Sequence, residues 1–218
     1  GLADPADLLN RSVRKKVAPA QAKKDALEQG MLKSWFDALR ISVDIVTAAY
    51  FEATLLTGAR PGEVVVLRWK DIDFQWNTIQ IRDKVEGTRT IPLTPYLAQR
   101  LAALPRRNEW VFSSATSTSG HLSDVHNAHT RAIKVAGLPH VTLHGLRRSF
   151  GSLAEWVECP VGVVAQIQGH KASAIAEKHY RVRPMDLLRM WHTKIEGWIL
   201  EQAGINQPTI GQATGLRV

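Results

Sequence analysis

The sequence predicts a mixed α+β fold that is mainly α-helical and carries a small antiparallel sheet. Most apolar residues recur at helical spacing along the chain. Only two short segments, 78–82 and 88–93, alternate polar and apolar residues, and the sequence Glu86-Gly87 between them suits the bend of a hairpin. The 218 residues, 44% of them hydrophobic, are sufficient for one full domain with extensions.

The predicted elements begin after a basic segment at the amino terminus. Residues 1–27 contain six Lys and Arg and few large apolar residues, so they are expected to form a linker or arm. Globular patterning starts at Trp35. A long buried helix is expected between the N-cap candidate Ser42 and a stop at Gly58, and Pro61 can begin a second, short helix.

The second half of the chain is predicted to be almost entirely helical. Thr94-Pro95 supplies an N-cap and a first-turn proline for a helix through Leu104, and the Ser/Thr-rich stretch 113–119 should be a loop. Further helices are expected over 122–136, 142–157, 160–168 and 184–203.

These elements predict four parts of the chain. They are the basic arm (1–27), a globular domain (28–183), an amphipathic C-terminal helix (184–205) and a loose tail (206–218). The chain begins with Gly1 and not with methionine, so we expect it to be a piece of a longer protein.

The charge balance favours a polyanionic partner. The chain has 28 Lys and Arg against 20 Asp and Glu, a net charge of +8. Residues 126–194 alone contain ten Lys and Arg against four Asp and Glu, a net charge of +6. Nucleic acid is the partner that such a surface attracts most directly, and a basic surface without a specific ligand is the alternative.

Other partner classes find little support in the sequence. No segment approaches the ~18 apolar residues that a membrane span needs. The single cysteine, Cys159, allows neither an intrachain disulfide nor a cysteine-based zinc site, and it is compatible with a reducing cytoplasm. The pairs His140/His144 and His126/His129 have helix-compatible spacing but lack acidic or cysteine partners. We therefore expect no metal and no cofactor.

Two regions of the chain have residue types suited to binding phosphate. His144 and Arg147 follow the N-cap candidate Thr142, so both would lie on one face of a helix near its positive end and could reach the same anion. Arg60 follows the buried helix at a sharp exit, where a rigidly held guanidinium suits bidentate phosphate binding. The alternatives are a surface pair for His144 and Arg147, and an ion pair with Glu63 for Arg60.

Lys84 and Tyr180 are candidates for proton transfer and nucleophilic attack. Lys84 lies at the predicted hairpin bend, where it could deliver a proton to a leaving oxygen or could simply be solvated. Tyr180 follows the sequence Gln168-Gly169-His170 by ten residues. A phenol with a pKa of about 10 is a poor nucleophile unless cations and a base assist it. Otherwise its hydroxyl would only cap the edge of the core.

The ordered set of these candidates resembles the signature of the tyrosine recombinases of the phage-integrase type, in residue type and in spacing. The set is Arg60, Lys84, His144, Arg147, His170 and Tyr180. The surrounding segments that match are Thr57–Glu63, Leu67–Asp73, Arg89–Leu93, His144–Phe150 and Gly169-His170. The resemblance covers about residues 30–182, most of the chain.

The chain departs from the family pattern at three places. Gly145 stands where the family usually has an aspartate or a similar residue, and Val85 stands where it often has a threonine. The interval from His170 to Tyr180 is one residue longer than usual. An extra residue inside a helix would rotate Tyr180 by ~100°, so we expect a loop to absorb it. His179 is the rival nucleophile.

The resemblance implies a role for each residue of the set. Arg60 and Arg147 would bind the non-bridging oxygens of a DNA phosphate, and His170 would donate a hydrogen bond to it. Tyr180 would be the nucleophile, with His144 as the acceptor of its proton. Lys84 would donate a proton to the leaving 5′ oxygen.

The implied activity is cleavage and rejoining of DNA strands through a 3′-phosphotyrosyl intermediate, without metal or ATP. Integration or excision of a prophage or genomic island is the expected setting, in the cytoplasm and at the nucleoid. The implied assembly is a homotetramer on paired sites of double-stranded DNA. The resemblance is also compatible with a monomer when DNA is absent, and with accessory DNA-bending proteins as further partners. Helix 184–205 could pack on its own domain or be exchanged between protomers. A type IB topoisomerase and a catalytically silent DNA-binding module are the alternative functions.

Overall fold

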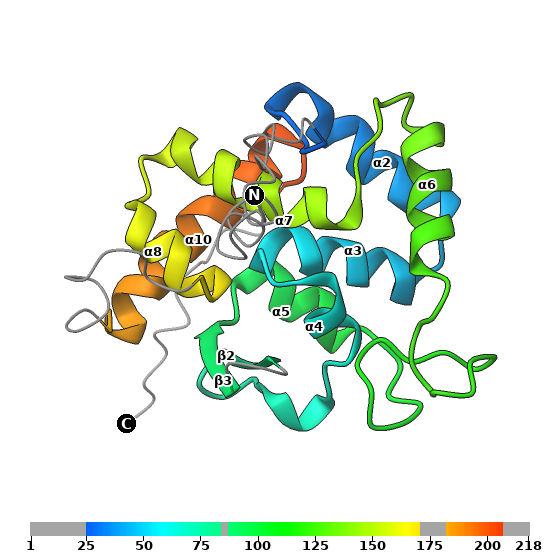
Figure 1. Cartoon of the computed structure of the whole chain (residues 1–218), viewed down its shortest axis with the longest axis horizontal. Helices are drawn as coiled ribbons and strands as arrows, with labels where there is room; N and C mark the ends of the chain where they lie inside the picture. Colours follow the sequence, from blue (N-terminus) through cyan, green and yellow to red (C-terminus); the bar gives the residue numbers. More distant parts are fainter. Residues whose placement is uncertain (1–24, 84–86, 171–181, 207–218) are drawn as a thin grey trace, which may run out of the picture.

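The computed structural model describes residues 25–83, 87–170 and 182–206. Within these ranges it confirms a mainly helical fold with one small antiparallel sheet (Figure 1). The longer helices are α2 (Leu32–Ser42), α3 (Ile45–Thr57), α4 (Pro61–Val65), α5 (Pro95–Ala102), α6 (Val125–Val135), α7 (Leu143–Ala154), α8 (Val161–Gln168) and α10 (Met185–Gln202). The 3-10 helices are η1 (Gln29–Met31), η2 (Trp69–Asp71) and η3 (Glu155–Val157).

Helix α3 is the central element of the core. Twelve of its thirteen residues are buried, and Figure 1 shows it beside α7 near the middle of the molecule. The predicted stop at Gly58 is confirmed, because this residue takes a left-handed conformation with φ of 58°. The predicted N-cap was wrong. Ser42 is the last residue of α2, and the Asp44 side chain accepts the backbone N–H groups of Val46 and Thr47 instead.

The sheet consists of three strands in the order β1-β2-β3. The strands β2 (Thr78–Asp83) and β3 (Gly87–Pro92) form the predicted hairpin, with Ile79 opposite Ile91 and Ile81 opposite Arg89. The two-residue strand β1 (Ile72–Asp73) was not predicted. Ile79, Ile81 and Ile91 are buried, so one face of the hairpin packs on the core.

Two buried carboxylates connect helices of the core. Glu52 in α3 accepts hydrogen bonds from Arg100 of α5, with Nε to Oε2 at 2.6 Å. Glu196 in α10 accepts the backbone N–H groups of Tyr96 and Leu97 at 2.9 and 3.2 Å. Glu196 therefore caps the first turn of α5, and this contact joins the C-terminal helix to the domain.

Helix α10 packs on its own domain. Its buried residues include Leu188, Ile195, Ile199 and Leu200, and it contacts β3, α2, α7 and α8. The single chain therefore has α10 packed in cis, and exchange of this helix between protomers stays a prediction. Within the described ranges, the chain has no helix whose length and apolar content would allow it to cross a membrane.

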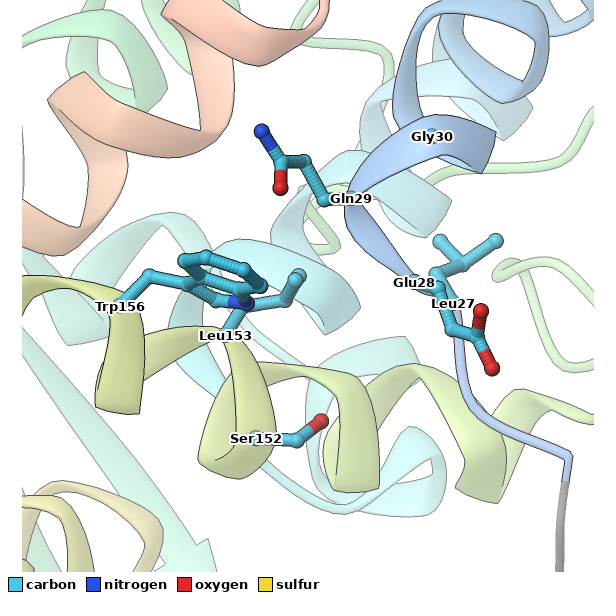
Figure 2. A pocket seen from close by; sticks show the side chains of 7 residues that line it. All are labelled: Leu27, Glu28, Gln29, Gly30, Ser152, Leu153 and Trp156. Atoms are coloured by element: carbon cyan, nitrogen blue, oxygen red, sulfur yellow. The ribbon is translucent and has the colours of Figure 1, made fainter.

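The chain enters the domain earlier than the predicted boundary at residue 28. Asp25 and Leu27 are only 8% and 1% exposed. The segment from Leu27 to Gly30 forms one wall of a surface hollow of about 380 Å³, and Ser152, Leu153 and Trp156 form the other (Figure 2). None of the candidate site residues lines this hollow.

His192 of α10 should make the stability of the domain depend on pH. Its side chain is fully buried, and Nε2 lies 2.7 Å from the carbonyl oxygen of Leu56. Nε2 must therefore donate, while Nδ1 has no hydrogen-bond partner among the described residues. Burial lowers the pKa of His192 to about 4 from 6.5, although the bond to Leu56 opposes the shift.

We expect His192 to weaken the fold as the pH falls from about 6.5 to about 4. The folded-state pKa is the lower one, so the unfolded chain binds the proton first and the loss approaches ~1.4 kcal/mol per pH unit. Urea unfolding of the wild type and of His192→Gln at several pH values measures this. Gln can still donate to Leu56, so the variant should lose this part of the pH dependence. The exposed His126→Gln is the control, and equal slopes in all three proteins would contradict the prediction.

Candidate active site

Helix α7 presents two of the predicted site residues at its amino-terminal end. Thr142 is the N-cap, as predicted, and its hydroxyl accepts the Gly145 N–H at 2.9 Å. His144 is exposed in the first turn, whereas Arg147, one turn later, is only 8% exposed. The positive end of the helix dipole lies at this terminus, which favours an anion near His144.

The guanidinium of Arg147 connects three segments of the chain. Its Nη1 donates to the carbonyl oxygens of Gly58 and Gln168, at 2.7 and 2.8 Å. The Gln168 side chain returns a bond from Nε2 to the backbone oxygen of Arg147 at 2.7 Å. Gly58 lies two residues before Arg60, and Gln168 lies two residues before His170. Arg147 therefore holds together the two segments that lead to the predicted site residues Arg60 and His170.

Arg60 lies directly before α4 and forms the ion pair that was considered as its alternative role. Its Nη1 is 2.8 Å from Glu63 Oε1, and its backbone N–H donates to Glu63 Oε2 at 2.9 Å. The side chain of Arg60 is 37% exposed, while that of Glu63 is 7% exposed. The two bonds fix the backbone of Arg60 and one nitrogen of its guanidinium, while part of the side chain is open to solvent.

Glu63 is held in its ionised form. Burial alone would raise the pKa of this carboxyl, but the hydrogen bonds from Arg89 and from Arg60 outweigh burial and lower it. A buried carboxylate of this kind is stable only while its donors are present.

His170 lies just beyond the end of α8. Its backbone N–H closes the last turn by donating to the Ala165 carbonyl oxygen at 2.8 Å, and Gly169 takes a left-handed conformation with φ of 72°. The His170 side chain is exposed. The chain therefore presents His170 at the surface, next to the backbone that Arg147 binds.

The structure places four of the six predicted site residues. It brings together the segments that carry Arg60, Arg147 and His170, and it places His144 on the same helix as Arg147. Lys84 and Tyr180 lie outside the described residues, and so does the rival nucleophile His179. Their roles stay predictions.

The glycine at 145, which departs from the family pattern, has a steric reason. A Cβ at this position would lie 1.9 Å from the carbonyl oxygen of Asp25. The Asp25 carboxylate accepts bonds from the Thr142 hydroxyl at 2.6 Å and from Arg148 Nε at 2.8 Å. The entering chain thus passes so close to α7 that only glycine fits, and Asp25 supplies a carboxylate beside the helix terminus.

Sequence reasoning assigned no role to Arg89 or Gln168, although both contact the site. Arg89 binds Glu63, and Gln168 binds Arg147. A signal for Arg89 was present, because it lies two residues before the buried Ile91 and so on the inward face of β3. A charge at such a position needs a buried partner. No comparable signal existed for Gln168.

The described residues contain no group of three or more His, Cys, Asp and Glu side chains that could hold a metal ion. His129, one of the histidines with helix-compatible spacing, is 2% exposed and its Nε2 accepts the indole N–H of Trp35 at 3.3 Å. Burial lowers the pKa of His129 to about 4, with a smaller contribution from His126 and His140. Its role is therefore to pack in the core.

Comparisons with known proteins agree with this fold. Residues 26–185 match the model of the phage integrase family. The prophage integrase IntF of Escherichia coli (strain K12) is 52% identical over 210 residues, which are 92% of this chain and 45% of that protein. The chain belongs to the phage integrase family. It spans less than half the length of this curated relative.

Solved structures show the same fold at low sequence identity. The integrase from mycobacterium phage Brujita superposes with a TM-score of 0.65 at 19% identity, over 84% of this chain and 65% of that one. The lambda integrase catalytic core gives a TM-score of 0.56 at 22% identity, over 68% of this chain and 96% of that one. A lambda integrase tetramer bound to a Holliday junction gives 0.53 at 21% identity, over 69% and 47%.

Proposed function

We propose that this chain is the catalytic part of a site-specific DNA recombinase that integrates or excises a prophage or genomic island. The observation that carries the proposal is the pair of bonds from Arg147 to Gly58 and Gln168, which gathers the segments leading to Arg60 and His170. Cationic and hydrogen-bonding residues on adjoining segments are suited to binding a phosphodiester. Membership of the phage integrase family and the 52% identity to a prophage integrase support the same function.

The proposed reaction begins with attack by the Tyr180 hydroxyl oxygen on the phosphorus of the scissile phosphodiester. The new bond is a 3′-phosphotyrosyl ester, and the bond from phosphorus to the 5′ oxygen breaks. His144 takes the phenolic proton, and Lys84 gives a proton to the leaving 5′ oxygen. The 5′-hydroxyl of another strand then attacks the phosphotyrosyl ester and releases Tyr180. The ester conserves the bond energy, so the reaction needs no ATP.

Arg60 and Arg147 are proposed to stabilise the charge on the non-bridging oxygens, with His170 as a further donor. Arg147 is suited to this because its backbone contacts fix the guanidinium before substrate arrives. Two guanidinium groups can neutralise the developing charge in place of a metal ion, so we expect activity in the presence of a chelator.

Double-stranded DNA is the proposed partner, and four protomers on paired sites are the proposed assembly. The net charge of +8 supports binding of DNA, and the tetramer of lambda integrase on a Holliday junction supports the assembly. In the absence of DNA, the proposed state is a monomer in which α10 packs on its own domain. On assembly, this helix is proposed to be exchanged between protomers. Accessory DNA-bending proteins are proposed as additional partners. The proposed location is the cytoplasm, at the nucleoid.

A pool of nicked suicide duplexes with randomised cores tests the proposed activity. Cleavage next to the nick releases a short fragment, so the covalent intermediate cannot be resealed and accumulates. We expect a protein–DNA adduct that survives denaturation, forms in the presence of EDTA and enriches particular core sequences. DNA binding without any adduct would support the catalytically silent module. An adduct without sequence enrichment, together with relaxation of any supercoiled plasmid, would support the topoisomerase.

A further inference from the structure

Arg89 is a largely buried cation on the inward face of the hairpin. It lies opposite Ile81 in the sheet register, and its side chain is 17% exposed. Its Nη1 and Nη2 donate to the two oxygens of Glu63 at 3.1 and 2.7 Å, and its Nε donates to the carbonyl oxygen of Ile167 at 3.2 Å. One side chain therefore joins β3 to α4 and to the end of α8.

The Glu63 carboxylate receives matched donors from Arg89 and from Arg60. Oε1 accepts Nη1 of both arginines, and Oε2 accepts Nη2 of Arg89 and the backbone N–H of Arg60. A carboxylate offers about four acceptor positions, and these bonds occupy all of them. Arg89 and Arg60 therefore hold Glu63 from both sides, and Glu63 in turn holds the backbone N–H and the Nη1 atom of Arg60.

Two arginines, Arg60 and Arg89, share the single carboxylate of Glu63, which leaves this cluster with an excess of positive charge. Arg60 and Glu63 alone would have no net charge, and their combined attraction for a phosphate would be weak. Arg89 adds a second cation, so the three groups together carry a net charge of +1. The hydrogen bonds from Arg89 also counter burial and keep the pKa of Glu63 below its usual value.

Arg89 also contacts the turn that leads to His170. Its bond to Ile167 lies at the last turn of α8. A Cβ at Gly169 would lie 2.9 Å from Arg89 Cδ, so the backbone of the turn packs directly on the arginine. The aliphatic part of Arg89 and its guanidinium thus support the segment before His170.

We propose that Arg89 is a positioning residue of the active site. It holds Glu63 and the end of α8 so that Arg60 and His170 face the same phosphate, and it leaves a net positive charge for that phosphate. This inference rests on the proposed function and extends it to a residue outside the predicted set.

The first test measures positioning without relying on activity. Native-state hydrogen exchange is followed at the amides of Arg60, Gly169 and His170 in the wild type, in Arg89→Met and in Arg89→Lys. Met keeps the apolar stem and loses every donor, so we expect exchange at these amides to be at least ~10-fold faster. Lys keeps the charge but cannot bind both oxygens and the carbonyl together, so its effect should be intermediate.

A matched control removes a similar ion pair elsewhere in the fold. Arg100 binds the buried Glu52 with its Nε at 2.6 Å, and its side chain is 26% exposed. Arg100→Met should lower the melting temperature, but it should leave the exchange of the Arg60 and His170 amides unchanged.

The second test compares adduct formation on two substrates, using a duplex selected from the randomised pool. One carries the ordinary phosphodiester, and the other carries an uncharged methylphosphonate at the scissile position. Arg89→Met should reduce the rate on the phosphodiester by at least ~10²-fold and on the methylphosphonate by less than ~10-fold. Arg100→Met should affect both substrates equally.

The outcomes separate this inference from the proposed function. Unchanged exchange at Arg60 and at His170 in Arg89→Met would overturn it whatever the activity. Equal losses on the two substrates would overturn it as well, because they would show a structural role only. If the wild type formed no adduct on any duplex, the proposed function would fail, and the exchange experiment alone would decide whether Arg89 holds these segments.

Discussion

Tyr180→Phe is expected to abolish the covalent protein–DNA adduct while leaving the affinity for DNA nearly unchanged. The substitution removes the nucleophilic oxygen and little else, and most of the affinity should come from phosphate contacts of the basic surface. None of the other five proposed site residues carries a hydroxyl group. The loss should therefore be complete, and this is the largest effect that we predict.

The measurement pairs the suicide-substrate assay with a binding titration at fixed salt concentration. His179→Ala is the matched control, because His179 is the adjacent candidate and should not be required for the adduct. Mass spectrometry of the peptide attached to DNA would identify the modified residue directly. An adduct that persists in Tyr180→Phe would assign the nucleophile to His179 or to another residue.

The fold could be predicted where the signals are local. Gly58, Pro61 and Thr142 mark helix ends through backbone preferences and caps that act over a few residues, and the structure confirms all three. The prediction that Ser42 is the N-cap of α3 was wrong, because a local pattern does not show where the preceding helix ends. Ser42 instead ends α2, which packs against α6 and α3, and Asp44 two residues later caps α3.

The site could be predicted as a list of residues but not as an arrangement. Order and spacing select Arg60, His144, Arg147 and His170 as candidates. The contacts that gather them link residues distant in sequence, such as Arg147 with Gly58 and Arg89 with Ile167. Such contacts depend on how helices and strands pack. For that reason the Arg60–Glu63 pair could be foreseen, whereas for Arg89 the sequence could indicate the need for a buried partner but not that this partner is Glu63.

Arg147→Ala is expected to lose cleavage by ~10²–10³-fold beyond any loss in DNA binding. Arg147 binds the phosphate partly in the ground state. It stabilises the additional negative charge on the phosphate only in the transition state. The structure adds a second consequence. Without Nη1, the buried carbonyl groups of Gly58 and Gln168 lose a donor, and each unsatisfied group costs about 1–3 kcal/mol.

Stability and catalysis must therefore be measured together for this substitution. Arg147→Lys keeps the charge and can bond to one carbonyl group, so it should recover much of the stability but little of the cleavage, which needs two parallel donors. Arg148→Ala is the matched control, since it removes the same side chain type from the next position of α7. Its partner Asp25 is only 11% exposed and would keep the bond from the Thr142 hydroxyl alone, so this variant should also lose stability, but cleavage should remain. If Arg147→Ala reduced cleavage only in proportion to DNA affinity, Arg147 would be a binding residue without a role in the transition state.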